Sequence, residues 1–533
     1  MFDSPEDEDD LSEAQEGDYF EAYGVGAWIG PNLIPELTAE ILEHALLRTH
    51  FFPSLNGNNP ELPSLFTSDS FTPAVSRQLA LLNFRDRRRG TDYIRFDQTK
   101  PDGHARHSGI PHPAAHAKLV SLLADNWVQI EHITTNQQSP LRPILTKNGR
   151  LFSSSYANSS SENSSWSEIA STGAEFHVKS DIKSFFPSIY THAFEWVPFG
   201  KQAAKGPKRQ SPLDGHFARH LDEALRFQNF GQTVGLVVGP GTSNIAAEYL
   251  LWPIDQQMCE EFGDRFRRRI DDYEFYARDE SEGKRFIKKL EGLLRDSELY
   301  LNPQKTRLTS IVAPTEEPWK IALGSVDTNW LESPREFANY WNQVLIQFQL
   351  TKDQRCLRWG MKVILNRAEK TEQMPWALSL LVRQIRPFPF LAPYLRYAIG
   401  ENLGERDLGE LYSILESKFE NLYSDAKVWL ISILGVNNKL DNKIASLVMK
   451  DMDALSLTLL NEFQLITELE LLSLLPDPDT NPHEADRYWL PRYQSSLRSK
   501  KVSDPEGVFE IMQKASVNFV KLEPFEKWGR NLG

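Results

Sequence analysis

Residues 176–190 read Phe176-His-Val-Lys-Ser-Asp181-Ile-Lys-Ser-Phe-Phe-Pro-Ser-Ile-Tyr190, an apolar and β-branched stretch with one carboxylate set into it. A second β-rich stretch, residues 266–276, reads Phe266-Arg-Arg-Arg-Ile-Asp271-Asp272-Tyr-Glu-Phe-Tyr276. Such strands are normally buried, and an unpaired carboxylate in a core is costly unless a cation neutralises it. We therefore expect Asp181 and Asp271 to form a paired divalent-metal site, which Asp272 supports.

Two further segments complete an ordered series. The first, residues 235–255, reads Gly235-Leu-Val-Val-Gly-Pro-Gly-Thr-Ser-Asn-Ile-Ala-Ala-Glu-Tyr-Leu-Leu-Trp-Pro-Ile-Asp255, and the second reads Leu299-Tyr-Leu-Asn-Pro-Gln-Lys305-Thr306. In this order the four segments resemble the palm of reverse transcriptases, with a fingers-and-palm region from about Tyr93 to Val326. The surrounding architecture resembles the abortive-infection (AbiK-like, unknown-group) branch of bacterial defence reverse transcriptases.

Composition sets outer limits on the protein. A chain of 533 residues with 40% hydrophobic residues can bury a sizeable core in two to four domains. Cys259 and Cys356 are the two cysteines, which excludes a disulfide scaffold and argues against a thiolate zinc site. No apolar run approaches the roughly 20 residues that cross a bilayer, and the acidic N-terminus is unlike a signal peptide. We expect a cytoplasmic protein without membrane contact.

The net charge of −14 argues weakly against non-specific coating of nucleic acid. Basic islands such as residues 201–209, 265–269 and 284–289 are predicted either to form a local phosphate track or to be ordinary solvated faces.

The pattern along the chain predicts an α+β protein in four parts. Residues 1–22 are acidic and are expected to be disordered. Residues 23–175 would hold N-terminal helices and the fingers, and residues 176–328 the palm, because strand pairs separated by helices indicate this class. Residues 329–533 show recurring helical stripes and are expected to form an all-α, HEAT-like repeat domain. Helices are predicted near 33–47, 76–82, 215–227, 243–255 and 282–294, and a loop at 153–171.

The resemblance implies nucleotide addition, an in-line attack of a hydroxyl on an α-phosphate with pyrophosphate leaving. Two Mg²⁺ ions about 3.5–4 Å apart, with Mn²⁺ as the alternative ion, suit this reaction and prefer oxygen ligands. Asp181 and Asp271 are the expected direct ligands, and Asp272 the supporting one. The backbone carbonyl of Ile182 is a further candidate ligand.

Several residues are candidates for binding the nucleotide. Phe186, five positions after Asp181, matches the family's bulky residue that lies under the sugar and disfavours a 2′-hydroxyl, so dNTPs are the expected substrates. The alternative is that Phe185 and Phe186 are ordinary core aromatics. The Gly/Pro turn would let backbone approach the nucleotide without Cβ obstruction; its candidates are Gly239, Pro240 and Ser243.

Three basic residues complete the candidates. Lys305 resembles the family lysine that neutralises or protonates departing pyrophosphate, and the alternative is a surface lysine. Lys100 and Arg106 lie in a fingers-type turn and would meet the triphosphate or the template. In the alternative interpretation they only solvate a hairpin.

Arg269 departs from the family pattern, which has an aromatic two positions before the paired aspartates. Arginine cannot pack as that aromatic does, so ordinary primer handling is in doubt. The resemblance implies untemplated synthesis primed by a protein tyrosine, with single-stranded DNA attached to that tyrosine and a homo-oligomeric assembly. Tyr19, Tyr23 and Tyr93 are conceivable primers. The alternatives are RNA-templated cDNA synthesis on a partner non-coding RNA, and a non-catalytic scaffold that binds nucleic acid or protein.

Overall fold

A computed structural model describes residues 36–53, 61–84, 90–100, 102–145, 150–152, 166–205, 215–312, 317–401, 403–499 and 502–522. The acidic segment 1–22, Tyr19 and Tyr23 lie outside these ranges. The predicted loop at 153–171 lies partly outside them too, but residues 166–170 are helical, which corrects that prediction. The helix is held at Trp166, whose indole N–H donates to the carbonyl of Asp264 at 2.9 Å.

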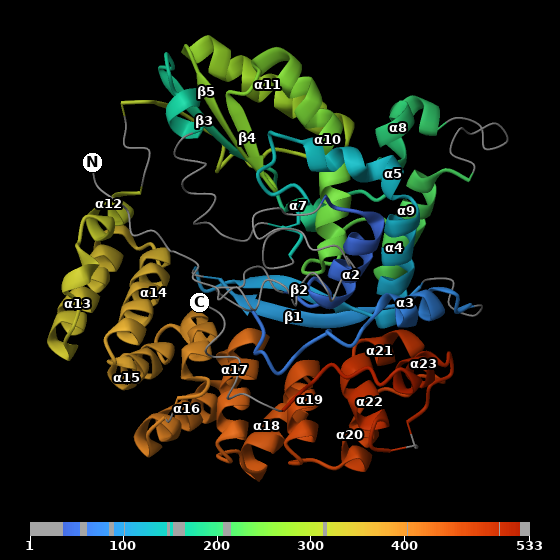
Figure 1. Ribbon diagram of the computed structural model, residues 1–533, viewed down its shortest axis with the longest axis vertical. Coiled ribbons are helices and arrows are strands. Elements are labelled where there is room, and N and C mark those ends of the chain that lie inside the picture. The colour runs from blue at the N-terminus through green and yellow to red at the C-terminus, as the bar shows by residue number, and fades with distance from the viewer. Residues whose placement is uncertain are drawn as a thin grey trace.

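The central sheet has four antiparallel strands in the order β4-β5-β3-β6. They are β3 (Phe176–Asp181), β4 (Phe266–Arg269), β5 (Asp272–Ala277) and β6 (Arg307–Ser310). Helix α11 (Glu280–Asp296) contacts β3, β5 and β6, and α10 (Gly241–Phe262) contacts α11 (Figure 1). The α+β palm predicted from the sequence is consistent with this arrangement.

Helix α11 shows why the sequence folds this way. Asp279 caps its start by accepting a hydrogen bond from the amide of Glu282 at 2.8 Å. Phe286, Leu290 and Leu294 form its buried stripe at helical spacing. The ring of Phe286 stacks on Phe275 of β5, with centroids 4.3 Å apart, and so fixes the helix on the sheet.

The N-terminal part combines helices with one hairpin. The hairpin pairs β1 (Tyr93–Thr99) with β2 (Ala105–Pro111). The helix predicted at 76–82 begins earlier, at Pro73, because proline suits the first helical position. The helices of this part and of the palm insertions are α2 (Ala39–Arg48), α3 (Pro73–Ala80), α4 (Pro113–Asp125), α5 (Trp127–Ile130), η1 (Glu131–Thr135), α7 (Phe185–Ser188), α8 (Ala193–Ala204) and α9 (Phe217–Gln228).

The described residues from 318 to 514 contain helices and no strand. Successive helices contact one another, as α13 does α14, α14 does α15 and α16 does α17, and together they form an arc below the hairpin (Figure 1). A HEAT-like repeat in this arc stays a prediction. Its elements are α12 (Pro318–Gly324), η3 (Thr328–Trp330), α13 (Pro334–Thr351), α14 (Arg355–Lys370), α15 (Met374–Ile385), η4 (Pro389–Ala398), α16 (Glu405–Lys418), η5 (Phe419–Asn421), α17 (Ser424–Val436), α18 (Asn442–Asp451), α19 (Ala454–Glu462), α20 (Glu468–Leu474), α21 (Pro482–Asp486), α22 (Trp489–Ser496) and α23 (Val508–Lys514).

The end of this arc returns to the N-terminal helices. Phe519 is fully buried, and its ring packs against Phe51, Phe71 and Trp489 at centroid distances of 5.6, 5.9 and 5.2 Å. Its carbonyl accepts a hydrogen bond from the amide of Thr67 at 3.0 Å. The first and last parts of the chain therefore share one hydrophobic core.

Among the described helices, none combines the length and the apolar character that crossing a membrane requires.

Candidate active site

Strand register brings the three aspartates together. Asp181 is the last residue of β3 and lies opposite Asp272, the first residue of β5. Asp271 lies in the turn between β4 and β5, where its carbonyl accepts a hydrogen bond from the amide of Ile182 at 2.9 Å. Residues distant in sequence thus meet at one end of the two inner strands. Asp181 is buried there, and Ile182 is fully buried beside it.

The electrostatics at this end of the strands favour a cation. Burial, together with the neighbouring charges of Asp272 and Asp181, raises the pKa of Asp271 to about 6. Burial and the charge of Asp181 also raise the pKa of Asp272. Each carboxylate therefore becomes easier to ionise when positive charge is nearby. Carboxylate oxygens are the donors that Mg²⁺ prefers, so the residues present fit that ion.

Lys305 supplies one positive charge within the cluster. Its Nζ donates to Oδ2 of Asp181 at 2.7 Å, and its side chain is 62% exposed. Burial alone would lower the pKa of Lys305, but the hydrogen bond and charge of Asp181, with the charges of Asp272 and Asp271, raise it. The structure therefore brings this predicted residue to the acids with one face open to solvent.

Asn302 belongs to the same site and was missed in the sequence. Its side-chain amide donates to Oδ1 of Asp181 at 3.1 Å, and its backbone amide donates to the Asp181 carbonyl at 2.8 Å. The amide of Lys305 in turn donates to the carbonyl of Asn302 at 3.1 Å. The sequence signal for Asn302 was the Leu-Asn pair before Lys305. The short polar turn that follows this pair places the side chains of Asn302 and Lys305 on the same side.

The structure separates the two adjacent phenylalanines. Phe185 is buried, 2% exposed, whereas Phe186 is only partly buried. Their ring centroids lie 5.1 Å apart, and the carbonyl of Phe186 accepts a hydrogen bond from the amide of Leu236 at 3.0 Å. Phe185 is therefore a core aromatic, while the sugar-gate role of Phe186 stays a prediction.

The Gly/Pro turn is hydrogen-bonded to the β1–β2 hairpin. The Val238 carbonyl accepts a hydrogen bond from the amide of Gly109 in β2 at 2.8 Å. Gly239 has a φ of +129°, and a Cβ there would lie 3.1 Å from the Gly109 carbonyl oxygen. A side chain at this position would push the hairpin away from the turn.

Pro240 and Ser243 lie where this turn ends and α10 begins. Pro240 is buried and immediately precedes α10. Ser243 is also buried, and its hydroxyl donates to the carbonyl of Val237 at 2.6 Å. This contact gives Ser243 a structural role in the turn, and its assignment to nucleotide binding stays a prediction.

The β1–β2 hairpin is hydrogen-bonded to the helical arc. Thr99, at the end of β1, donates from its amide and its hydroxyl to the buried carboxylate of Asp425, both at 2.8 Å. Arg358 donates to the Thr99 carbonyl at 2.9 Å. Lys100 and Arg106 lie beside this tip, where Arg106 is exposed. No contact in the described part of the chain joins either residue to the aspartates, so their assignment stays a prediction.

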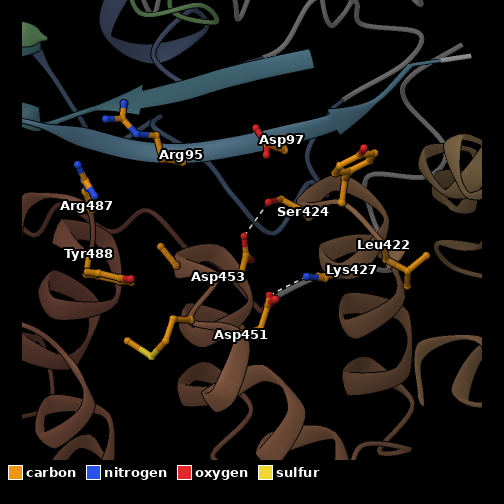
Figure 2. Close-up of a pocket in the computed structure, with 12 residues that line it drawn as sticks. Arg95, Asp97, Leu422, Ser424, Lys427, Asp451, Asp453, Arg487 and Tyr488 are labelled. Carbon is orange, nitrogen blue, oxygen red and sulfur yellow. Dashed lines mark hydrogen bonds and ion pairs between the residues drawn. The ribbon is translucent and has the colours of Figure 1, made fainter. Parts of the chain in front are cut away.

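A pocket of about 320 Å³ lies at the same junction (Figure 2), and its lining includes none of Asp181, Asp271 and Asp272. Arg95 and Asp97 of β1 line one side, and residues of the helical arc line the other. Its charges are already paired: Lys427 contacts Asp451 at 2.7 Å, and the Ser424 hydroxyl donates to Asp453 at 2.7 Å. We assign the pocket to the packing of the hairpin on the arc.

A second cluster of possible metal ligands comprises His192, Glu195 and Asp222, whose ligand atoms lie within 4.8 Å of one another. Arg226 binds Asp222 at 2.9 Å, and Arg219 lies 3.6 Å from Glu195. These ion pairs neutralise both carboxylates, so the cluster is accounted for without a metal.

The basic island at 265–269 is largely not a phosphate track. Arg265 pairs with Glu282 at 2.6 Å, and Arg268 is fully buried against Glu248 and Asp255. Neither prediction for the island anticipated a buried arginine. The signal was an alternating strand pattern in which Arg268 falls on the same face as Phe266. Arg269 lies on the other face and pairs in register with Asp272.

Residues 115–358 match the family model described as reverse transcriptase (RNA-dependent DNA polymerase). The match contains the three aspartates, both phenylalanines, the Gly/Pro turn and Lys305. No curated protein matches the chain significantly.

Proposed function

We propose that Asp181, Asp271 and Asp272 are the catalytic metal ligands of this chain, a nucleotidyltransferase of the DNA polymerase class whose residues 115–358 form a reverse transcriptase domain. The register that sets Asp181 opposite Asp272, with Asp271 in the adjoining turn, carries this proposal. The reaction joins a hydroxyl oxygen to the α-phosphorus of a dNTP and releases pyrophosphate. Bound Mg²⁺ supplies charge stabilisation and lowers the pKa of the attacking hydroxyl.

The chain's own residues contribute positioning and charge. Lys305 is exposed on one side and protonated, so it is suited to neutralise the departing pyrophosphate. Asn302 and Lys305 together orient Asp181. Phe186, partly exposed beside the Gly/Pro turn, would lie under the sugar and make dNTPs the preferred substrates.

We further propose that synthesis is untemplated and protein-primed, in a cytoplasmic, homo-oligomeric protein of the phage-defence type. Two observations support this. The palm is followed by a helical arc that already binds the fingers tip through Asp425 and Arg358. Arg269 also replaces the aromatic expected for ordinary primer handling. Tyr93 is a weak primer candidate, because its ring lies under Arg95 at 3.6 Å and would meet any side chain placed at Gly109.

RNA-templated cDNA synthesis on a partner non-coding RNA is the second candidate. It is favoured by the description of the matching family, which is RNA-dependent.

One experiment distinguishes these possibilities. Purified protein is incubated with Mg²⁺ and labelled dNTPs, with and without prior RNase treatment. Label that survives RNase and migrates covalently with the protein supports untemplated, protein-primed synthesis. Label lost after RNase supports a templating RNA. Absence of incorporation in both arms would contradict the polymerase proposal and favour a binding scaffold.

A further inference from the structure

Arg268 is the centre of a buried charged network behind the aspartates. It is fully buried, and its guanidinium donates to both carboxylate oxygens of Glu248, at 2.9 and 2.8 Å. It also donates from Nε to Asp255 at 2.9 Å. Glu248 and Asp255 stand seven residues apart on α10, so both face the same side of that helix. The network therefore ties β4 to α10.

Other buried groups hold the same network from further elements. The hydroxyl of Tyr273 in β5 donates to Asp255 at 3.0 Å, and the side-chain amide of Asn136 donates to it at 2.8 Å. The amide of Arg268 donates to the carbonyl of Gln138 at 2.7 Å. Replacing buried charges with apolar side chains is often neutral or stabilising, so stability alone is a poor reason for such an arrangement.

The network reaches the catalytic turn through one hydrogen bond. Nη1 of Arg268 donates to the carbonyl of Ile270 at 3.0 Å. Ile270 is the first of two loop residues between β4 and β5, and its φ is +56°. A β-branched residue rarely adopts this left-handed conformation, and strained residues persist where the surroundings over-determine them.

Asp271 is consequently held on both sides. The carbonyl that precedes it, that of Ile270, accepts from Arg268, and its own carbonyl accepts from the amide of Ile182. With both adjoining peptide groups fixed, the direction of the Asp271 Cα–Cβ bond, from which the carboxylate extends, is fixed too. We propose that Arg268 is a positioning residue that sets the geometry of the metal site through the Ile270 carbonyl. This inference rests on the proposed role of Asp271 as a metal ligand.

The test compares Arg268→Lys with the matched control Arg265→Lys. Arg265 directly precedes β4, at the end away from the turn, and donates to Glu282 and to the carbonyl of Tyr276. Lysine keeps the charge but lacks the planar fork that serves two carboxylates and a carbonyl together. Mn²⁺ affinity is measured by electron paramagnetic resonance without nucleotide, beside thermal melting and the Mg²⁺ dependence of dNTP incorporation.

We expect Arg268→Lys to bind Mn²⁺ about tenfold more weakly or worse, the usual effect of losing support behind a metal ligand. The apparent Mg²⁺ requirement of Arg268→Lys is expected to rise, while its KM for dNTP stays near the wild-type value. The control Arg265→Lys is expected to match wild type in Mn²⁺ affinity, Mg²⁺ requirement and KM. Wild-type Mn²⁺ affinity in folded Arg268→Lys would overturn the proposal.

Two further variants separate a folding defect from the role of Arg268 and test the metal site independently. If Arg268→Lys fails to fold, Arg268→Met combined with Glu248→Gln and Asp255→Asn leaves no unpaired charge in this network, and its Mn²⁺ affinity must fall likewise. Asp271→Asn tests the metal site itself. Retained Mn²⁺ binding in Asp271→Asn contradicts the proposed function, whereas loss there with wild-type binding in Arg268→Lys contradicts only the role of Arg268.

Discussion

At the residue scale, the site depends on carboxylates whose environment makes their charge costly. Burial and the charges of Asp272 and Asp181 raise the pKa of Asp271 to about 6. The side chains of Lys305 and Asn302 bind Asp181 from the opposite side. A bound cation would relieve the repulsion among the aspartates. The proposed function therefore rests on side chains that the fold alone would not favour at these positions.

Asp271→Asn is expected to abolish dNTP incorporation, because it removes a metal-binding charge at nearly constant volume. Asp296→Asn, an exposed change at the end of α11, is the control and should retain wild-type activity. Incorporation of labelled dNTPs and thermal melting are measured on both proteins. Wild-type incorporation by a folded Asp271→Asn would refute the assignment.

The two phenylalanines should respond differently to alanine. Phe186→Ala is expected to lower discrimination against ribonucleotides by about tenfold or more, since steric rejection by one side chain is of that order. Phe185→Ala instead removes a buried ring and should cost about 3–5 kcal/mol of unfolding free energy. Competing rATP and dATP incorporation tests the first, and denaturant unfolding tests the second. Unchanged discrimination in Phe186→Ala would argue against the gate.

At the element scale, the β1–β2 hairpin is fixed rather than free. Asp425 of α17 accepts two hydrogen bonds from Thr99, and the indole of Trp489 lies 3.5 Å from the carbonyl of Ile110 at the other end. Both ends of the hairpin are thus held by the helical arc. A fingers element held in this way is positioned by residues far downstream in the chain.

Thr99→Val is expected to destabilise the protein by about 1–3 kcal/mol, because one buried oxygen of Asp425 loses its hydroxyl donor. The effect should be local: relative to wild type, hydrogen exchange should accelerate more in residues 93–111 than elsewhere in the chain. Thr480→Val, on an exposed turn, is the control. Equal exchange in the hairpin of wild type and Thr99→Val would show that this contact does not fasten it.

At the scale of the whole molecule, the hairpin junction also couples stability to pH. Glu61 accepts a hydrogen bond from Gln98, and burial, opposed by Arg106, raises the pKa of Glu61 from 4.5 to about 7. The folded protein therefore keeps this proton between those values while the unfolded chain loses it. The free energy of unfolding consequently falls as pH rises from about 4.5 to about 7.

Glu61→Gln should remove this decline, because glutamine does not titrate. At pH 8 the variant is expected to be more stable than wild type by about 1–2 kcal/mol, with no gain at pH 4. Urea unfolding across this pH range measures the difference, and Glu369→Gln on the exposed surface is the control. Parallel curves for wild type and Glu61→Gln would contradict the prediction.

The shared core of the two chain ends makes a further prediction at this scale. Phe519→Ala should cost about 3–5 kcal/mol, since it empties a site lined by Phe51, Phe71 and Trp489. Hydrogen exchange should then accelerate in the N-terminal segment 61–80 as well as near residue 519. Acceleration confined to the C-terminal end would mean that the two segments unfold independently.

The sequence by itself determined the acids, their order and the class of chemistry. Carboxylates in β-rich stretches, an intervening Gly/Pro turn and a following lysine are local patterns. Such patterns can be recognised in the linear sequence without knowledge of the fold. For the same reason α11 and the helical character of the last third could be predicted. The helix at 166–170 and the full length of α10 could not, because packing decides where helices end.

Only the tertiary structure decided which residues support the site. Arg268 lies in a run of arginines that resembles a solvated surface, and its burial depends on Glu248 and Asp255 of α10 and Asn136 of the fingers segment. Asp425 and Thr99 likewise meet only after the helical arc folds back under the hairpin. Partnership between distant residues sets the cost of burying a charge, and a sequence pattern records the charges but not their partners.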